Sequence, residues 1–144
     1  MIKTVAKILQ NKGHEVYSVA PEATVYQALE IMAEKEVGAL VVLEKGKVVG
    51  IFSERDYARS VELQGLESRT TLVRQVMTEM LHYITPEKSV EDGMSLVTES
   101  HCRHLPVLKD NELIGLVSIG DLVKASLAEK DFVIKQLKSY IKGK

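Results

Sequence analysis

Two short motifs in this chain place a carboxylate three residues after a serine: Ser53 precedes Asp56, and Ser118 precedes Asp121. At the start of a helix, such a pair caps free backbone N–H groups. The same pair can also bind a ligand, because a helix N-terminus attracts phosphate and a carboxylate accepts hydrogen bonds from ribose hydroxyls. Each motif follows a Gly-apolar-apolar sequence at a predicted strand end, where binding sites of α/β proteins tend to lie. Both roles can coexist in one residue.

The stretch His101–His104 raises the question of a zinc site, because histidine and cysteine are zinc ligands. Only His14 and His82 remain as further histidines, and the chain has no paired cysteines. Cys102 is not favoured as a nucleophile either, since its counterpart in an internal repeat is the apolar Val37. The chain also has no Gly-x-Ser-x-Gly, P-loop or Gly-x-Gly-x-x-Gly motif. The sequence therefore predicts neither a metal site nor an enzyme.

The two Ser-x-x-Asp motifs belong to that internal repeat, in which residues 16–59 match residues 81–124 without a gap. The offset is 65 residues, as in Pro21 and Pro86 (86 − 21 = 65), and it also carries Gly50 to Gly115. Self-similarity at a fixed spacing indicates a duplicated structural unit. We therefore expect two similar half-sites.

Each copy predicts the element order β-α-β-β-α. A proline ends the first strand, Thr24 or Ser89 caps the first helix, and Gly46 or Asn111 lies in the hairpin turn. The last helix begins at the Ser-x-x-Asp motif. The predicted strands are Val16–Ala20, Ala39–Leu43 and Val48–Phe52 in the first copy and Leu81–Thr85, Leu105–Leu108 and Leu113–Val117 in the second, and the closing helices are Glu54–Gln64 and Ile119–Ala128.

These patterns predict an α/β (α+β) fold of tandem units. A copy of about 45 to 60 residues has a marginal core by itself, so we expect the two to pack as one pseudo-two-fold symmetric domain. The predicted divisions are residues 1–66 for the first copy with the N-terminal segment, 72–130 for the second copy and 131–144 for a C-terminal helix. Apolar residues recur at helical spacing within Glu129–Lys142, and that face can pack on the body or on a second subunit.

Composition narrows the function classes. The 144 residues include 19 basic and 20 acidic side chains, and the formal net charge of −1 argues against a nucleic-acid partner or an anionic membrane. The single cysteine is typical of a reducing compartment. The N-terminus lacks the pattern of a signal peptide, and no apolar run is long enough for a transmembrane helix. We therefore expect a soluble protein, located in the cytoplasm if the source is prokaryotic.

Four sequence stretches resemble those of a known family. They are Val37–Val42 and Cys102–Val107, which lead into the hairpins, and Gly50–Asp56 and Gly115–Asp121, which lead into the last helices. With the tandem β-α-β-β-α order, the chain resembles a CBS-domain pair, or Bateman module, of the stand-alone bacterial type. The resemblance implies a regulatory module that binds an adenine nucleotide such as AMP, ADP, ATP or NADH and senses energy or redox state. It also implies a homodimer, an unidentified protein target and no catalytic cofactor.

The resemblance further implies two unequal clefts, each built from both copies. Adenine lies against one copy, and the ribose and phosphates meet the Ser-x-x-Asp motif of the other. By this pattern the first cleft joins Lys12, Tyr17, Val37, Gly38 and Ala39 to Arg103, His104, Ser118 and Asp121. The second joins Met77, Thr78, His82, Cys102, Arg103 and Leu105 to Ser53, Arg55 and Asp56, and Pro106 and Gly120 complete the set of nucleotide-binding residues.

The two clefts differ in their phosphate-binding side chains. Arg103 and His104 can neutralise phosphate, but their counterparts in the first copy are Gly38 and Ala39. Arg55 is a second phosphate ligand, and its counterpart is Gly120, which leaves room for a longer ligand such as NADH. The alternative hypothesis is a ligand-independent structural or partner-binding assembly module, in which the Ser-x-x-Asp motifs only cap helices.

Overall fold

The computed structural model describes residues 3–80 and 82–141, with the backbone alone for Tyr140. Two compact units account for these residues. We call Glu15–Leu81 the central unit, and we call Met1–His14 together with His82–Lys144 the terminal unit. The N-terminal segment therefore packs with the second sequence copy, and the residues that link the copies pack with the first. Contacts divide the chain differently from the repeat, for which we predicted residues 1–66, 72–130 and 131–144.

The central unit is a four-stranded sheet with short helices. The sheet order is β1-β2-β3-β4, in which β1 is parallel to β2 and the other neighbours are antiparallel. Its fully buried core includes Val25, Leu40 and Phe52. The elements are β1 (Ser18–Val19), α2 (Val25–Lys35), β2 (Ala39–Glu44), β3 (Lys47–Ser53), α3 (Glu54–Asp56), the π-helical segment η1 (Tyr57–Glu62), α4 (Val73–Val76) and β4 (Thr78–Glu79).

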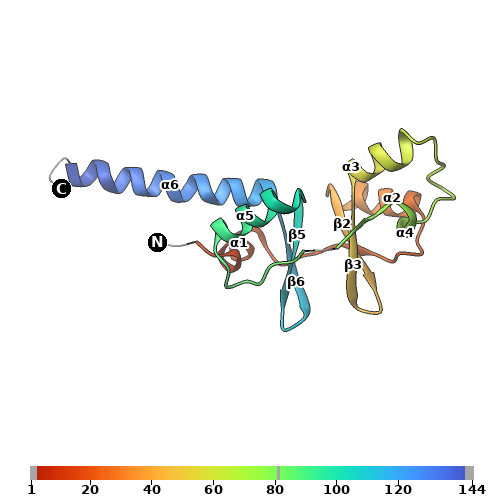
Figure 1. The fold of residues 1–144 in the computed structure, drawn as a ribbon, viewed down its shortest axis with the longest axis horizontal. Coiled ribbons are helices and arrows are strands. Elements are labelled where there is room, and N and C mark those ends of the chain that lie inside the picture. Colours follow the sequence, from red (N-terminus) through yellow and green to blue (C-terminus); the bar gives the residue numbers. More distant parts are fainter. Residues whose placement is uncertain (1–2, 81, 142–144) are drawn as a thin grey trace. The chain divides into compact units, whose positions relative to one another are not determined.

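The terminal unit is a β-hairpin packed with three helices (Figure 1). A single parallel bridge from Ile84 to Val107 stands where the central unit has β1. The fully buried core includes Leu9, Leu105 and Leu122. The elements are α1 (Val5–Lys12), α5 (Val90–Ser100), β5 (His104–Lys109), β6 (Glu112–Ser118) and α6 (Ile119–Ile141).

The structure confirms the predicted mixed α+β fold and both hairpins. The turn residues Lys45 and Gly46 have positive φ angles of 51° and 79°, and Asp110 and Asn111 have 51° and 66°. Two consecutive residues with positive φ form the tight turn whose twist matches that of the flanking strands. The strand register also shifts at the same place in both copies, directly after Val42 and Val107.

The predicted helix caps are confirmed as well. Thr24 Oγ1 accepts a hydrogen bond from Gln27 N at 3.1 Å, and Gln27 Oε1 accepts one from Thr24 N at 2.9 Å. Ser89 and Asp92 form the same reciprocal pair at 3.0 and 3.1 Å. Such capping boxes satisfy backbone donors that have no partner within the helix, so α2 and α5 begin at defined residues.

Both closing helices differ from the prediction. The segment predicted as a helix from Glu54 to Gln64 becomes π-helical after Asp56, and Leu63 N donates to Ala58 O across five residues. Tyr57 Oη donates to Glu62 Oε2, also five residues on, which suits π-helical spacing. In the terminal unit, α6 does not end at Ala128 but continues to Ile141. The end of the predicted C-terminal segment, residues 142–144, and Leu81 of the predicted strand Leu81–Thr85 lie outside the described residues.

Two helices were not predicted, α1 and α4. The sequence signal for α1 is present, because Thr4 Oγ1 accepts a hydrogen bond from Lys7 N at 3.3 Å and the buried Val5, Ile8 and Leu9 share one helical face. The segment lies before the repeat, so it has no second copy that would support the helix pattern. The packing of the two copies as one pseudo-symmetric domain stays a prediction.

Candidate functional site

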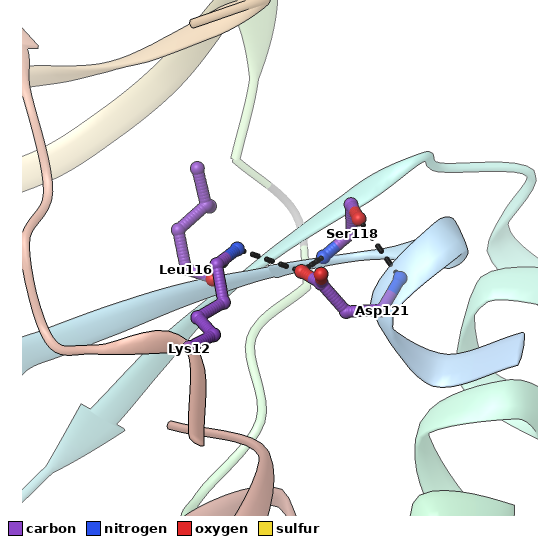
Figure 2. Close-up of polar contacts among 4 residues, drawn as sticks. All are labelled: Lys12, Leu116, Ser118 and Asp121. Atoms are coloured by element: carbon purple, nitrogen blue, oxygen red, sulfur yellow. Dashed lines mark hydrogen bonds and ion pairs between the residues drawn. The ribbon is translucent and has the colours of Figure 1, made fainter. Parts of the chain in front are cut away.

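The motif at the start of α6 is a helix cap in the terminal unit. Ser118 N donates to Asp121 Oδ2 at 2.8 Å, and Asp121 N donates to Ser118 Oγ at 3.1 Å. Strand β6 carries the serine and the first turn of α6 carries the carboxylate, so the strand-to-helix junction itself brings the two together (Figure 2). Ser118 and Asp121 therefore cap α6, which is the structural role that the sequence predicts for this motif.

Lys12 joins this cap from the end of α1, and we call Lys12, Ser118 and Asp121 the Asp121 cluster. Lys12 Nζ lies 2.7 Å from Asp121 Oδ2 and donates to the carbonyl oxygen of Leu116 at 2.9 Å. Figure 2 shows the lysine and the carboxylate reaching toward one another above β6. Lys12 thus connects α1 with β6 and α6, which come more than one hundred residues later in the chain.

The Asp121 carboxyl is held in its ionised form. Partial burial by itself raises its pKa, but the hydrogen bonds from Lys12 and from the backbone of Ser118, with the charge of Lys12, outweigh this effect and lower the pKa. The hydrogen bonds from Lys12 and Ser118 both reach Oδ2. They leave Oδ1 outside this network, as an anionic acceptor at the N-terminus of a long helix.

The equivalent motif in the central unit has different partners. Ser53 donates to Asp56 Oδ2 from its backbone N at 2.9 Å and from its Oγ at 3.0 Å. Thr78 Oγ1, at the start of β4, donates to Asp56 Oδ1 at 2.8 Å. Both carboxylate oxygens are therefore engaged. A neutral hydroxyl contacts Asp56 here, whereas a lysine contacts Asp121 in the terminal unit.

Each motif is tied to the residue that leads into its own hairpin. Glu54 N donates to Gly38 O at 3.0 Å, and Ile119 N donates to Arg103 O at 2.9 Å. These matching bonds place Gly38 beside the central motif and Arg103 beside the terminal one. The structure also brings Lys12 to Asp121 within the terminal unit, and Thr78 to Asp56 within the central unit. The clefts that combine residues of both units stay predictions.

The other predicted site residues fall into two groups. Ala39, Leu105 and Pro106 are buried, so a ligand could meet them only through their backbone. The remaining ones are at least partly exposed. A Cβ added to Gly120 would lie 3.6 Å from Ser118 Oγ, which is an ordinary van der Waals distance. The residues with accessible surface are Tyr17, Val37, Gly38, Arg55, Met77, Thr78, His82, Cys102, Arg103, His104 and Gly120.

Two of these side chains have hydrogen-bond partners close in sequence. Tyr17 Oη donates to Glu15 Oε2 at 2.6 Å, and that bond raises the pKa of the tyrosine. Cys102 Sγ lies 3.0 Å from Ser100 Oγ. Within residues 3–80 and 82–141, no three His, Cys, Asp or Glu side chains gather closely enough to hold a metal ion. No described helix is long and apolar enough to cross a membrane.

A groove lies beside the Asp121 cluster in the terminal unit. It has a volume of about 330 Å³ and runs between α1 and α6. Four lysines line it, and we call it the lysine groove: Lys3, Lys7 and Lys12 on the α1 side and Lys124 on α6, with Asp121 at its edge. Apart from Lys12, sequence reasoning missed these lysines, although the spacing of Lys7 and Asn11 places those two residues on one side of a helix.

Comparison with known proteins matches this chain to proteins with CBS domains. Residues 2–62 and 73–128 each match the sequence profile of the CBS domain. A CBS domain-containing mitochondrial protein of Arabidopsis thaliana is 39% identical over 149 residues, which cover 97% of this chain and 72% of that protein.

Solved structures are similar over most of the chain. A CBS-domain protein from Burkholderia ambifaria is 46% identical, with a TM-score of 0.81 over 88% of this chain and 95% of that one. A hexameric CBS-CP12 protein from bloom-forming cyanobacteria is 26% identical, with a TM-score of 0.77 over 85% of this chain and 71% of that one.

Proposed function

Because this chain belongs to the CBS-domain family and carries the domain twice, we propose that it is a regulatory module whose ligand is an adenine nucleotide. Tandem CBS domains are generally regulatory modules that bind ligands or partner proteins. AMP, ADP, ATP and NADH are the candidate ligands. The nucleotide would report the energy or redox state of the cell to a protein target, and the chain itself would not be a catalyst.

The Asp121 cluster is the observation that carries this proposal. A carboxylate that only capped α6 would need no cation, as Asp92 shows in the capping box of α5. Asp121 is instead partly buried, pairs with Lys12 and keeps Oδ1 outside its bonds to Lys12 and Ser118. Such an oxygen can accept hydrogen bonds from ribose hydroxyls, while the N–H groups of the first turn of α6 favour phosphate.

Regulation follows if the nucleotide binds one conformation of the chain better than another. A ligand shifts a conformational equilibrium only by its difference in affinity for the two states. The proposal therefore requires that bound and free protein differ in shape or in partner affinity. Small-angle scattering of the ligand-stripped protein, with and without a saturating nucleotide, measures the first of these differences.

Calorimetric titration with AMP, ADP, ATP and NADH tests the binding, and the chain offers a matched control variant. Asp121→Asn keeps the shape of the side chain but removes its charge, and we expect it to weaken binding about tenfold. Asp92→Asn makes the same change at the same position of another helix cap in the same unit. We expect it to leave nucleotide affinity unchanged.

Two outcomes contradict the proposal. Equal affinities of both variants and the parent protein would remove Asp121 from the site. Absence of binding by all four nucleotides would favour the ligand-independent assembly module, whose stability does not respond to a nucleotide. A ligand at a hundredfold excess over its Kd stabilises the folded state by about 2.7 kcal/mol, so thermal unfolding gives an independent reading.

We further propose that the protein is a homodimer. Exposed apolar side chains line α6, and Leu127, Leu137 and Ile141 are 61%, 56% and 81% exposed. Contiguous apolar surface of this kind is typical of protein–protein contacts. The hexameric relative supports self-association in this family. The cytoplasmic location stays a prediction.

A further inference from the structure

The lysine groove carries more positive charge than the Asp121 cluster needs. Lys12 is paired with Asp121 at 2.7 Å. Lys3, Lys7 and Lys124 also line the groove, and none of them forms an ion pair with another described residue. Three uncompensated cations thus gather in one groove of a chain whose formal net charge is −1. Like charges that line one groove repel one another, and a bound anion would relieve this repulsion.

The shape of the groove suits a narrow, extended anion. Ala125 and Ala128 on α6 are small, and they leave space opposite α1. Lys7 lies one helical turn, about 5.4 Å, from Asn11 on α1, and Lys3 precedes the N-cap of that helix. The cations are therefore spread along the groove and not concentrated at one point. A chain of linked phosphates has the same distribution of charge.

We propose that the lysine groove binds the polyphosphate chain of the nucleotide whose ribose is held by Asp121. This inference rests on the proposed function, and it specifies the ligand class: nucleoside triphosphates bind more tightly than monophosphates. The α-phosphate lies near the N-terminus of α6, and the following phosphates extend between Lys7 and Lys124. AMP has only the α-phosphate and therefore no phosphate to place between Lys7 and Lys124.

Calorimetric titration of the ligand-stripped full chain with AMP, ADP and ATP tests this order, and inorganic tripolyphosphate tests the groove without a nucleoside. We expect ATP to bind about tenfold or more tightly than AMP, with ADP between them. Lys7→Gln and Lys124→Gln should each weaken ATP and tripolyphosphate binding about tenfold and leave AMP unchanged. Lys130→Gln removes an exposed cation of α6 outside the groove and should change none of these affinities.

The failure of this inference is distinguishable from that of the proposed function. Equal affinities for AMP and ATP, unaffected by Lys7→Gln and Lys124→Gln, would overturn the groove and leave nucleotide binding intact. Lysine-dependent binding of tripolyphosphate alone would support the groove as a polyphosphate site and contradict the nucleotide. No binding of ATP or tripolyphosphate would overturn the groove directly.

Discussion

Leu9 occupies the space in which a side chain at position 115 would stand, because a Cβ on Gly115 would lie only 2.6 Å from Leu9 Cδ2. Met77 stands in the same relation to Gly50, where a Cβ would lie 2.8 Å from Met77 Sδ. Leu9 and Met77 are thus structural counterparts, although the offset of 65 residues does not pair them. In each unit a strand glycine makes room for a side chain from a helical segment, Leu9 within α1 and Met77 at the C-cap of α4.

The two glycines should respond differently to mutation. The three atoms nearest to a Cβ at position 115 all belong to the side chain of Leu9, and we expect Gly115→Ala to lower the free energy of unfolding by about 1 to 3 kcal/mol. In Leu9→Ala/Gly115→Ala the added methyl group enters the space that leucine left, so the loss should be smaller than the sum of the single losses. Urea unfolding of the four proteins measures this coupling.

Gly50→Ala provides the contrast. A Cβ there would also lie 2.7 Å from the backbone oxygen of Thr78, which no trimming of Met77 removes. We expect the double variant Met77→Ala/Gly50→Ala to lose as much free energy of unfolding as the two single variants together. Rescue in the central unit as strong as in the terminal unit would show that β4 moves freely away from β3.

The contact between Lys12 and Asp121 predicts a dependence of stability on pH. The pKa of Asp121 is lowered in the folded chain, so its ionisation stabilises the fold above the ordinary value of 3.8, and this contribution is lost as the pH falls through the lowered pKa. Lys12→Met removes the cation, and the pKa of Asp121 should rise. The loss of stability at neutral pH should be modest, about 0.5 to 1 kcal/mol, because Lys12 is partly exposed.

Carbonyl-detected NMR titration of Asp121 measures the pKa directly, and urea unfolding between about pH 3 and 7 measures the linked stability. Lys130→Met is the control, since it removes an equal charge elsewhere in the terminal unit. An unchanged pKa of Asp121 in Lys12→Met would mean that the two groups do not meet in solution.

Asp92 allows a cap to be measured in which serine supplies the hydrogen bonds and a lysine, Lys88, acts only through its charge. Its pKa is lowered by the hydrogen bond from the backbone of Ser89 and then by the Ser89 side chain. We expect Ser89→Ala to raise the pKa of Asp92 toward 3.8, because the side-chain part of this interaction is lost. The same NMR titration reports it. A pKa of Asp92 at its ordinary value in the parent protein would contradict the capping box of α5.

Self-association through α6 predicts a change in mass. Leu137→Glu introduces a charge into the exposed apolar side of α6, and we expect the protein to become monomeric in light scattering coupled to size-exclusion chromatography. Ser139→Glu adds the same charge two residues away on another side of the helix and should leave the mass unchanged. A dimer that survives Leu137→Glu would exclude this part of α6 from the contact.

Local patterns were sufficient to predict the hairpins and the caps of α2 and α5, because Thr24, Ser89, Gly46 and Asn111 act on neighbours within three residues. The repeat and the family resemblance placed Lys12 and Asp121 in one cleft. Spacing alone could not do so, since their contact depends on how α1 packs against β6 and α6. The π-helical turns after Asp56 were also missed, because an apolar pattern does not separate a period of 3.6 residues from a locally wider one.

Helix α6 is continuous, so a movement at one of its ends is transmitted to the other. Its first turn holds Asp121 and its last turns carry the exposed Leu137 and Ile141, so one rigid rod of 23 residues connects a chemical site to an apolar surface. At 1.5 Å per residue the rod is about 34 Å long, and a tilt of about 5° at the Asp121 end would move the far end by about 3 Å. A small adjustment around Asp121 would therefore be amplified, through leverage alone, into a displacement large enough to separate one packed side chain from its neighbour.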